Sequence, residues 1–417
     1  MIKSKPKNVR LFLPPSPIPF LPTLNESFEL LGLPADINRL ARVLSLRHGV
    51  ALPVDSKTLK KAVHDPISLT SAGKITDWLR GFLPNKINDD VADDLFNKWR
   101  SLGVLSNGFQ WEAGVLYPIK MTGDEELQEL RSVRFIKRRL DQEYGFVSDL
   151  KAIGDGSVPR SKVESAWRQP LIQHTNIDPK VIDEAFPHLI FWGRSGEEEL
   201  TPEGCHSVQR LFLHMLIDFY FSVIACLDFD YSFHLLKSDI EVSIRERLVK
   251  QGLFKNLAPY QSEETFREPL DRLFEEWRYT LSPTDQHPLT LRDLYRCIPV
   301  SPDKNRKHEQ NYIRIEDAEA DLEESKRLQF RSWRKGKKRP SFNLLDAFVE
   351  ALVVEELDLS MAILRARWAN SLGRFIARER EKNRNSSFPI SDDEVLEAFS
   401  SYPKYWSLFG FQEADQT

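Results

Sequence analysis

Apolar residues recur at helical spacing along most of the chain. The spacing predicts amphipathic helices over residues 37–46, 75–82, 125–143 and 266–277, and a longer apolar-periodic pair over 342–381. The one long apolar run, Leu211–Leu227, includes His214 and Asp218 and is short for a bilayer span. We therefore interpret it as a buried helix and expect no membrane partner.

Residues 72–117 suggest a small mixed unit. The helix over 75–82 is followed by a second expected helix over 90–102, and then by Asn107-Gly108, a hairpin turn signal, among the short apolar runs of 104–117. Two helices followed by a ribbon predict a winged-helix-like α/β unit. Acidic residues at the start of the second helix would repel phosphate, so this unit is expected to contact protein.

These patterns predict a mainly α, multidomain protein. A chain of 417 residues is long enough for two or three domains. Boundaries drawn at Pro-, Gly- and charge-rich stretches give five segments: 1–66, a basic Pro-rich arm with a short helical segment; 67–155, the winged-helix-like unit and a helix; 156–300, a central helical domain; 301–340, a charged linker or basic helix; and 341–417, a C-terminal helical domain.

The first 24 residues are basic and then rich in proline (LFLPPSPIPFLPTL). This composition favours an extended conformation, and prolines interrupt it too often for a signal peptide. Its Leu, Ile and Phe side chains would be costly to leave in water, so we expect the arm to dock in a groove or on a partner. A Pro-rich recognition ligand is the alternative.

Composition narrows the function classes. Three widely spaced cysteines offer no disulfide framework or Cys-x-x-Cys site, which favours a reducing cytoplasmic location. The sequence has no P-loop, dinucleotide, zincin or nucleophile-elbow motif, so no cofactor is expected. Asp228-x-Asp230 is interpreted as a polar helix exit, and no metal site is predicted.

One stripe of the 211–227 helix carries candidate catalytic groups. Arg210, His214 and Asp218 are spaced four apart, which places an acid, a base and a cation on one helix face. The set resembles the Arg-x4–6-His arrangement of HEPN-type ribonucleases, although only three residues separate Arg210 from His214. Arg168 and His174, with five intervening residues and Gln169 after the Arg, fit that pattern better. The alternative is a core histidine bonded to Asp218.

The strongest binding signal lies late in the chain. Eight of the fourteen residues from Lys326 to Arg339 are basic, and two aromatic rings are interleaved among them. Cations neutralise phosphates and a ring can stack on an unpaired base, so the predicted nucleic-acid-binding residues are Lys326, Arg327, Phe330, Arg331, Trp333, Arg334, Lys335, Lys337, Lys338 and Arg339. Because an acidic run precedes them, a self-neutralised helix is the alternative.

We therefore expect a non-enzymatic nucleic-acid-binding subunit or adaptor of a larger protein assembly, contacting phosphates through residues 326–339. A metal-independent HEPN-like ribonuclease using a His/Arg pair, and a pure protein-interaction scaffold, are the alternatives. The expected partners are nucleic acid and other protein subunits. The overall net charge of −4 excludes a globally basic nucleic-acid coat but not a local patch.

Overall fold

The computed structural model is mainly helical, as the sequence predicts. It describes residues 8–9, 21–22, 27, 45, 51–64, 67–82, 108–116, 119–120, 123–154, 168–195, 201–237, 242–259, 266–281, 287–299, 315–352 and 356–411. The helices expected over 37–46 and 90–102 fall, apart from Ser45, outside these residues.

The chain forms two compact units. The first comprises residues 1–29 and 33–223, and the second comprises residues 30–32 and 224–417. The boundary lies within the segment 156–300 that the sequence analysis treats as one domain; the five-part division stays a prediction.

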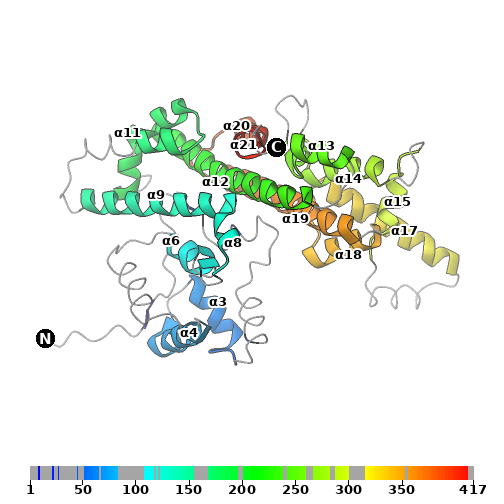
Figure 1. Ribbon diagram of the computed structural model, residues 1–417, viewed down its shortest axis with the longest axis horizontal. Coiled ribbons are helices and arrows are strands. Elements are labelled where there is room, and N and C mark those ends of the chain that lie inside the picture. Colours follow the sequence, from blue (N-terminus) through cyan, green and yellow to red (C-terminus); the bar gives the residue numbers. More distant parts are fainter. Residues whose placement is uncertain are drawn as a thin grey trace. The chain divides into compact units, whose positions relative to one another are not determined.

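The first unit holds two short strands and a series of helices (Figure 1). They are β1 (Asn8–Val9), α3 (Ser56–His64), β2 (Ile67–Ser68), α4 (Leu69–Phe82), α6 (Gly108–Trp111), the π-helical turn η1 (Glu112–Leu116), α8 (Glu125–Glu129), α9 (Arg131–Gly154), α11 (Pro179–Ser195) and the first part of α12 (Pro202–Leu236). β1 pairs with β2 in an antiparallel register that matches Asn8 with Ser68 and Val9 with Ile67.

Two apolar clusters stabilise this unit. One forms between α11 and the start of α12, with Ile182, Phe186 and Leu211 among its buried members. The other joins α3, β2 and α4 through Leu59, Ile67 and Ile75. In both, apolar side chains at helical spacing meet the matching face of a neighbour, which is the main source of helix stability in a globular protein.

The prediction of a β-ribbon over 104–117 is wrong for residues 108–116, which the structure describes. Gly108–Trp111 is α-helical and Glu112–Leu116 is π-helical, so no strand pairs there among the described residues and a winged-helix unit is not confirmed. Trp111 is buried against Phe219 of α12, with ring centroids 5.2 Å apart. This long-range contact, and not the local turn signal at Asn107-Gly108, decides the conformation.

α12 contains the apolar run Leu211–Leu227, and the prediction of a buried helix there is confirmed. Among the described helices it alone is long and apolar enough to cross a membrane, but 78% of its most apolar stretch is buried inside the protein. Burial of this kind is typical of a core helix.

The second unit contains the remainder of α12 and a bundle of further helices. They are α13 (Val242–Gln251), the 3₁₀ turn η3 (Lys255–Leu257), α14 (Pro269–Thr280), α15 (Leu291–Arg296), α17 (Ile315–Arg334), α18 (Phe342–Leu352), α19 (Glu356–Arg384), α20 (Asp392–Phe399) and α21 (Tyr402–Phe409). The helical spacing at 266–277 and 342–381 therefore identifies α14, α18 and α19 correctly.

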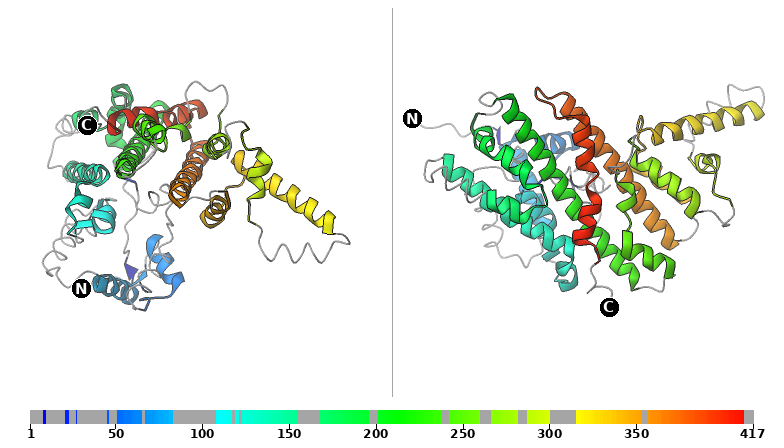
Figure 2. Two further views of the ribbon diagram at one scale, coloured as in Figure 1. Left: turned by 45° about the vertical axis from the view of Figure 1, so that its right-hand side comes forward. Right: turned by 90° about the horizontal axis from the view of Figure 1, so that it is seen from above.

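α19 is the central helix of this bundle. α14 and α18 both pack along it (Figure 2), and α17 packs on α14. Aromatic rings fill the interior: Phe274 stacks on Phe330, and Phe254 lies 4.8 Å from Trp368 between ring centroids. Rings of this size contribute most of the buried apolar area in such a core.

Side chains and one glycine fix the helix ends. Thr290 with Asp293 and Ser391 with Glu394 form capping boxes at the starts of α15 and α20. At the end of α17 the amide of Lys337 donates to the carbonyl of Ser332 and that of Gly336 to Trp333, which is a Schellman motif. Gly336 has a φ of 63°, the left-handed conformation that this motif requires.

Gly336→Ala is expected to destabilise the second unit by about 1–2 kcal/mol or more. The left-handed conformation disfavours a side chain, and an added Cβ would lie 2.2 Å from Oε1 of Glu268. Urea unfolding followed by circular dichroism measures the change. Gly73→Ala in α4 is the matched control, because its Cβ would meet nothing within 4 Å and alanine is the better helix former. Equal stability of the two variants would contradict this role for Gly336.

Candidate nucleic-acid interface

The basic segment 326–339 spans the last turns of α17 and the turn that follows it. α17 begins with acidic residues and ends with basic ones, an order that its dipole favours. Apolar and charged positions alternate at helical spacing, so one face of the helix is turned to the core and the other to solvent. The ten predicted binding residues are consequently divided between these two environments.

Both aromatic rings of the segment face the core. Phe330 and Trp333 are each only 2% exposed. Phe330 stacks on Phe274 at 4.8 Å, and Trp333 meets Phe348 edge to face at 5.7 Å. The expectation that these rings lie on an outward-facing surface is wrong, since neither can stack on a base without leaving its core contacts.

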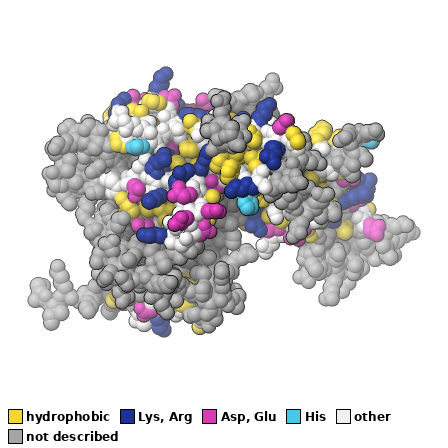
Figure 3. Space-filling model, in the orientation of Figure 1, with side chains coloured by type: hydrophobic (Ala, Val, Ile, Leu, Met, Phe, Trp, Pro, Cys, Tyr) yellow, Lys and Arg dark blue, Asp and Glu magenta, His cyan; other side chains and the backbone are white. Residues whose placement is uncertain are grey.

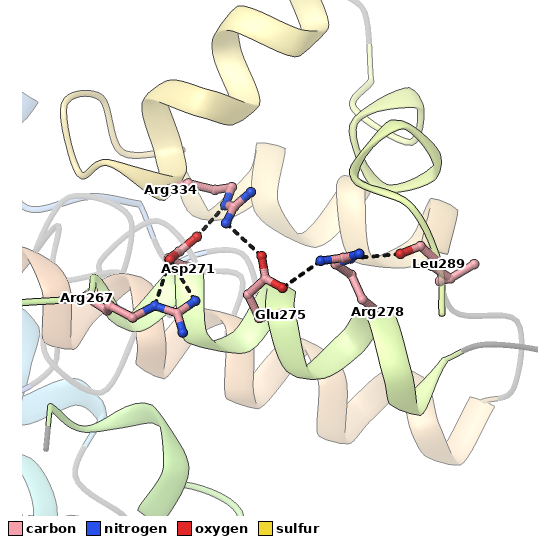
Figure 4. A network of polar contacts seen from close by, with 6 residues as sticks. All are labelled: Arg267, Asp271, Glu275, Arg278, Leu289 and Arg334. Atoms are coloured by element: carbon pink, nitrogen blue, oxygen red, sulfur yellow. Dashed lines mark hydrogen bonds and ion pairs between the residues drawn. The ribbon is translucent and has the colours of Figure 1, made fainter. Parts of the chain in front are cut away.

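Arg334 of the segment is engaged by two acids of α14 (Figure 4). Arg334 bonds Asp271 and, at 2.7 Å, Oε1 of Glu275. Arg267 bonds Asp271 and Arg278 bonds Glu275, so that cations and anions alternate through the network of five side chains. Alternation of this kind neutralises each partly buried charge through short charge-assisted hydrogen bonds.

Arg339 and the first two cations of the segment are also engaged. Arg339 donates to Glu268 at 2.8 Å, with both side chains largely buried. Lys326 donates to the backbone carbonyl of Arg296 at 2.7 Å, and Arg327 forms a two-bond pair with Glu324. Arg327 with Glu324 realises the self-neutralised alternative, but at an exposed position where such a pair contributes little.

Four cations remain on the solvent side. Arg331, Lys335, Lys337 and Lys338 are exposed. None of the four has a side-chain hydrogen bond or ion pair within the described part of the chain. They lie within eight residues: Arg331 is one helical turn before Lys335, and the chain reverses at Gly336 to place Lys337 and Lys338 beyond the helix end.

The described part of the face in Figure 3 has no comparable excess of positive charge. On the described part of the face in Figure 3, Lys and Arg side chains are interspersed with Asp and Glu. A large field of one sign is absent from that part of the surface. On that part of the surface, attraction for a polyanion would need a local cluster of cations.

A shallow depression between α15 and α17 is closed by its own ion pairs. It is lined by Tyr295, Ala320, Glu323, Glu324 and Arg327. Glu323 accepts from Arg292 and from the Tyr295 hydroxyl. The hydrogen bond from Arg292 holds the pKa of Glu323 down at about 2, so this carboxylate is a permanent counter-ion and not a proton-transfer group.

Two of the three residues proposed as catalytic on α12 have partners on other helices. Asp218 is fully buried and pairs with Arg139 of α9 while accepting from the backbone amide of Asn176 at 2.8 Å. Arg210, on the same helix as Asp218, bonds Glu184 of α11 instead. Asp218 is thus the partner of a buried cation, which is a structural role.

The second ribonuclease pair, Arg168 and His174, stays a prediction, although Arg168 also has an acidic partner. Arg168 forms a two-bond pair with Asp183 at 2.7 and 2.9 Å, and His174 is exposed. His214 is half-buried in α12. No group of three or more His, Cys, Asp or Glu side chains in the described residues is arranged to hold a metal ion.

Asp228 is an unusual buried acid. Its interpretation as a polar helix exit is wrong, because α12 continues past it to Leu236. It accepts from the amides of Leu253 and Phe254, at 2.8 and 3.1 Å, and from the hydroxyls of Ser232 and Tyr402. Burial raises its pKa to about 7 despite these bonds. It fixes the turn after α13, since the groups that donate to it are neutral donors of the protein itself.

Sequence reasoning missed the acids that neutralise the basic segment. It sought them in the acidic run just before residue 326, whereas Arg334 and Arg339 bond Glu268, Asp271 and Glu275 about sixty to seventy residues upstream. The signal was present, because these three acids recur at helical spacing beside the apolar stripe of α14. Only the packing of α17 on α14 makes the pairing visible.

No protein-family model, curated protein or solved structure matches this chain.

Asp228→Asn is expected to change how stability depends on pH. A folded pKa of about 7 lies above the unfolded value of 3.8, so ionisation disfavours the folded state. The free energy of unfolding should fall as pH rises from about 4 to about 7, by at most about 1.4 kcal/mol per pH unit. Wild type and variant are compared by urea unfolding at several pH values. The stability of wild type minus that of the variant should shrink through this window.

Asp230→Asn is the control for losing one acidic group from the same helix. Its stability relative to wild type should not show the trend of the Asp228 comparison. A wild-type advantage over Asp228→Asn that is constant or grows from pH 4 to pH 7 would contradict the raised pKa.

Proposed function

We propose that this protein is a non-catalytic helical adaptor that binds nucleic acid through phosphate contacts alone, made by Arg331, Lys335, Lys337 and Lys338. The observation that supports it is the division of the basic segment. Four of its cations are held in internal contacts, and the four named above are exposed with no acidic partner among the residues that the structure describes. When free cations that lie close together neutralise phosphates, counterions are released from the nucleic acid, which favours binding.

The buried rings define what kind of binding is proposed. Sequence is read by contacts to base edges, and unpaired bases are held by stacking. With Phe330 and Trp333 in the core, the segment offers neither an aromatic platform nor a preformed base-reading surface. The proposed contact is therefore independent of sequence and depends on phosphate density, which is about twice as high along a duplex as along one strand.

Cellular placement belongs to the same proposal. All three cysteines are free, two of them buried and Cys297 half-buried. Free thiols are compatible with a reducing compartment, so we propose a cytoplasmic subunit acting beside other proteins. The basic residues of the N-terminal arm, at 3, 5, 7 and 10, would add to the phosphate contact. All four lie outside the residues that the structure describes.

Neutralising the four free cations should weaken binding to a duplex at least about tenfold. The variant Arg331→Gln, Lys335→Gln, Lys337→Gln, Lys338→Gln is titrated against a labelled 20-base-pair duplex by fluorescence anisotropy over a range of salt concentrations. For wild type, the slope of log K against log salt should not exceed about 3.6 in magnitude if these four cations carry the contact. The variant should lose this slope and bind at least about tenfold more weakly at low salt.

A matched control removes the same charge elsewhere. Lys57, Lys61, Lys74 and Lys180 are exposed in the first unit, and their replacement by Gln should leave both affinity and slope close to wild type. If the variant with four Gln substitutions at residues 331–338 binds the duplex as tightly as wild type, these residues do not make the contact. No binding by wild type at low salt, to duplex or single strands, would remove the nucleic-acid function altogether.

A protein-interaction scaffold is the second candidate, favoured by exposed apolar side chains in the second unit. Tyr279 of α14 is 65% exposed and Leu328 of α17 is 50% exposed. Large apolar side chains at such exposure are typical of contact surfaces when they cluster. This candidate is the one left if wild-type protein binds no nucleic acid.

A further inference from the structure

The N-terminal arm is held by the first unit at two described places. Asn8–Val9 adds a two-residue strand to β2, and further along the arm Leu21 is completely buried and Pro22 is buried too. Two residue pairs of a strand are too few to hold a segment alone. The anchorage at Leu21–Pro22 is therefore the stronger candidate for the contact that secures the arm.

Trp111 makes that anchorage. Its Nε1–H donates to the carbonyl oxygen of Pro22 at 2.8 Å, across 89 residues of sequence, and its indole is 2% exposed. Phe219 of α12 packs on the indole edge to face, and Phe135 of α9 packs on Phe219 at 6.0 Å. A buried indole N–H needs an acceptor, and here the arm provides it.

The chemistry of this contact is that of proline-segment recognition. An extended Pro-rich segment has no internal hydrogen bonds, so the carbonyl of a proline in it is available to an outside donor. The residue before a proline is biased towards an extended conformation. Aromatic-lined grooves recognise Pro-rich segments because these lose little entropy on binding. The arm sequence LFLPPSPIPFLPTL repeats the unit of an apolar residue followed by proline, at 13–14, 18–19 and 21–22.

We propose that Trp111 is the centre of a binding site for an apolar residue–proline segment, filled in this protein by its own Leu21–Pro22. The arm is then a removable intramolecular ligand and not a fixed part of the core. When the arm is displaced, the site accepts the same kind of segment from a separate peptide. This inference does not depend on the proposed nucleic-acid contact.

The test uses the full-length chain with its own anchor weakened. Leu21→Asp places a charge at a fully buried position of the arm and leaves the site itself unchanged. A labelled peptide with the sequence of residues 11–24 should bind this variant and not the wild type, whose site is filled. The same peptide with Asp at the position of Leu21 is the control and should not bind.

Trp111→Phe in the Leu21→Asp background keeps an aromatic ring and removes the N–H donor. Loss of one buried hydrogen bond should weaken peptide binding about tenfold. Failure of the peptide to bind Leu21→Asp, or equal binding with and without the indole N–H, overturns the proposal.

A second measurement on wild type keeps the proposal testable if Leu21→Asp does not fold. The indole N–H resonance of Trp111, identified by its loss in Trp111→Phe, should exchange with solvent faster than the core amides of α12, because release of the arm is a local opening. Exchange of the indole only at the rate of global unfolding would show that the arm is part of the core, and would overturn the proposal.

Discussion

The acidic stripe of α14 is the constraint on which the second unit depends. Glu268, Asp271 and Glu275 each lie at no more than 24% side-chain exposure, and Glu276 is similarly covered. Partly buried carboxylates are stable only with cations and good geometry. Arginines from three different elements meet this requirement: Arg334 ends α17, Arg339 lies in the turn after it, and Arg365 is on α19. Neutralising α14 therefore also positions α17 and α19 against it.

This constraint decides which charges remain for a ligand. A count of basic residues between 326 and 339 treats all of them as equivalent, but the cations that satisfy α14 are not free to neutralise phosphate. Arg334 would have to leave two carboxylates to do so. The surface potential of such a segment is set by the residues left after internal pairing, and here they are concentrated at the Schellman turn, where cations also oppose the negative end of the helix dipole.

The positions of several helices were predictable from this sequence. Whether a given side chain faces the core or solvent was predictable only in part. Spacing located α4, α14, α18, α19 and the buried run of α12 because one apolar face repeats over several turns. Phe330 and Trp333 were placed on the wrong side although their three-residue spacing is itself a core signal, because the basic residues around them outweighed it. The ribbon near residue 110 failed for another reason: Trp111 is fixed by Phe219 and Pro22, which are distant in sequence.

The two buried acids of α12 show how one helix uses two kinds of partner. Asp218 is met by a cation, Arg139, within the first unit, and Asp228 is met only by neutral donors within the second. The peptide bond between residues 253 and 254 links Asp228 to a cation indirectly. Its N–H donates to Asp228 and its C=O accepts from Arg365 Nε at 2.8 Å.

A peptide group bonded at both ends is polarised by each partner, which strengthens both hydrogen bonds. Arg365 also forms a two-bond pair with Glu276, so α12, the turn after α13, α19 and α14 are joined by one chain of polar contacts. The arginine thus stabilises Asp228 without touching it. This explains how a carboxylate can be buried within an apolar helix beside uncharged groups, and why the turn at 252–254 is fixed by side chains from two other helices.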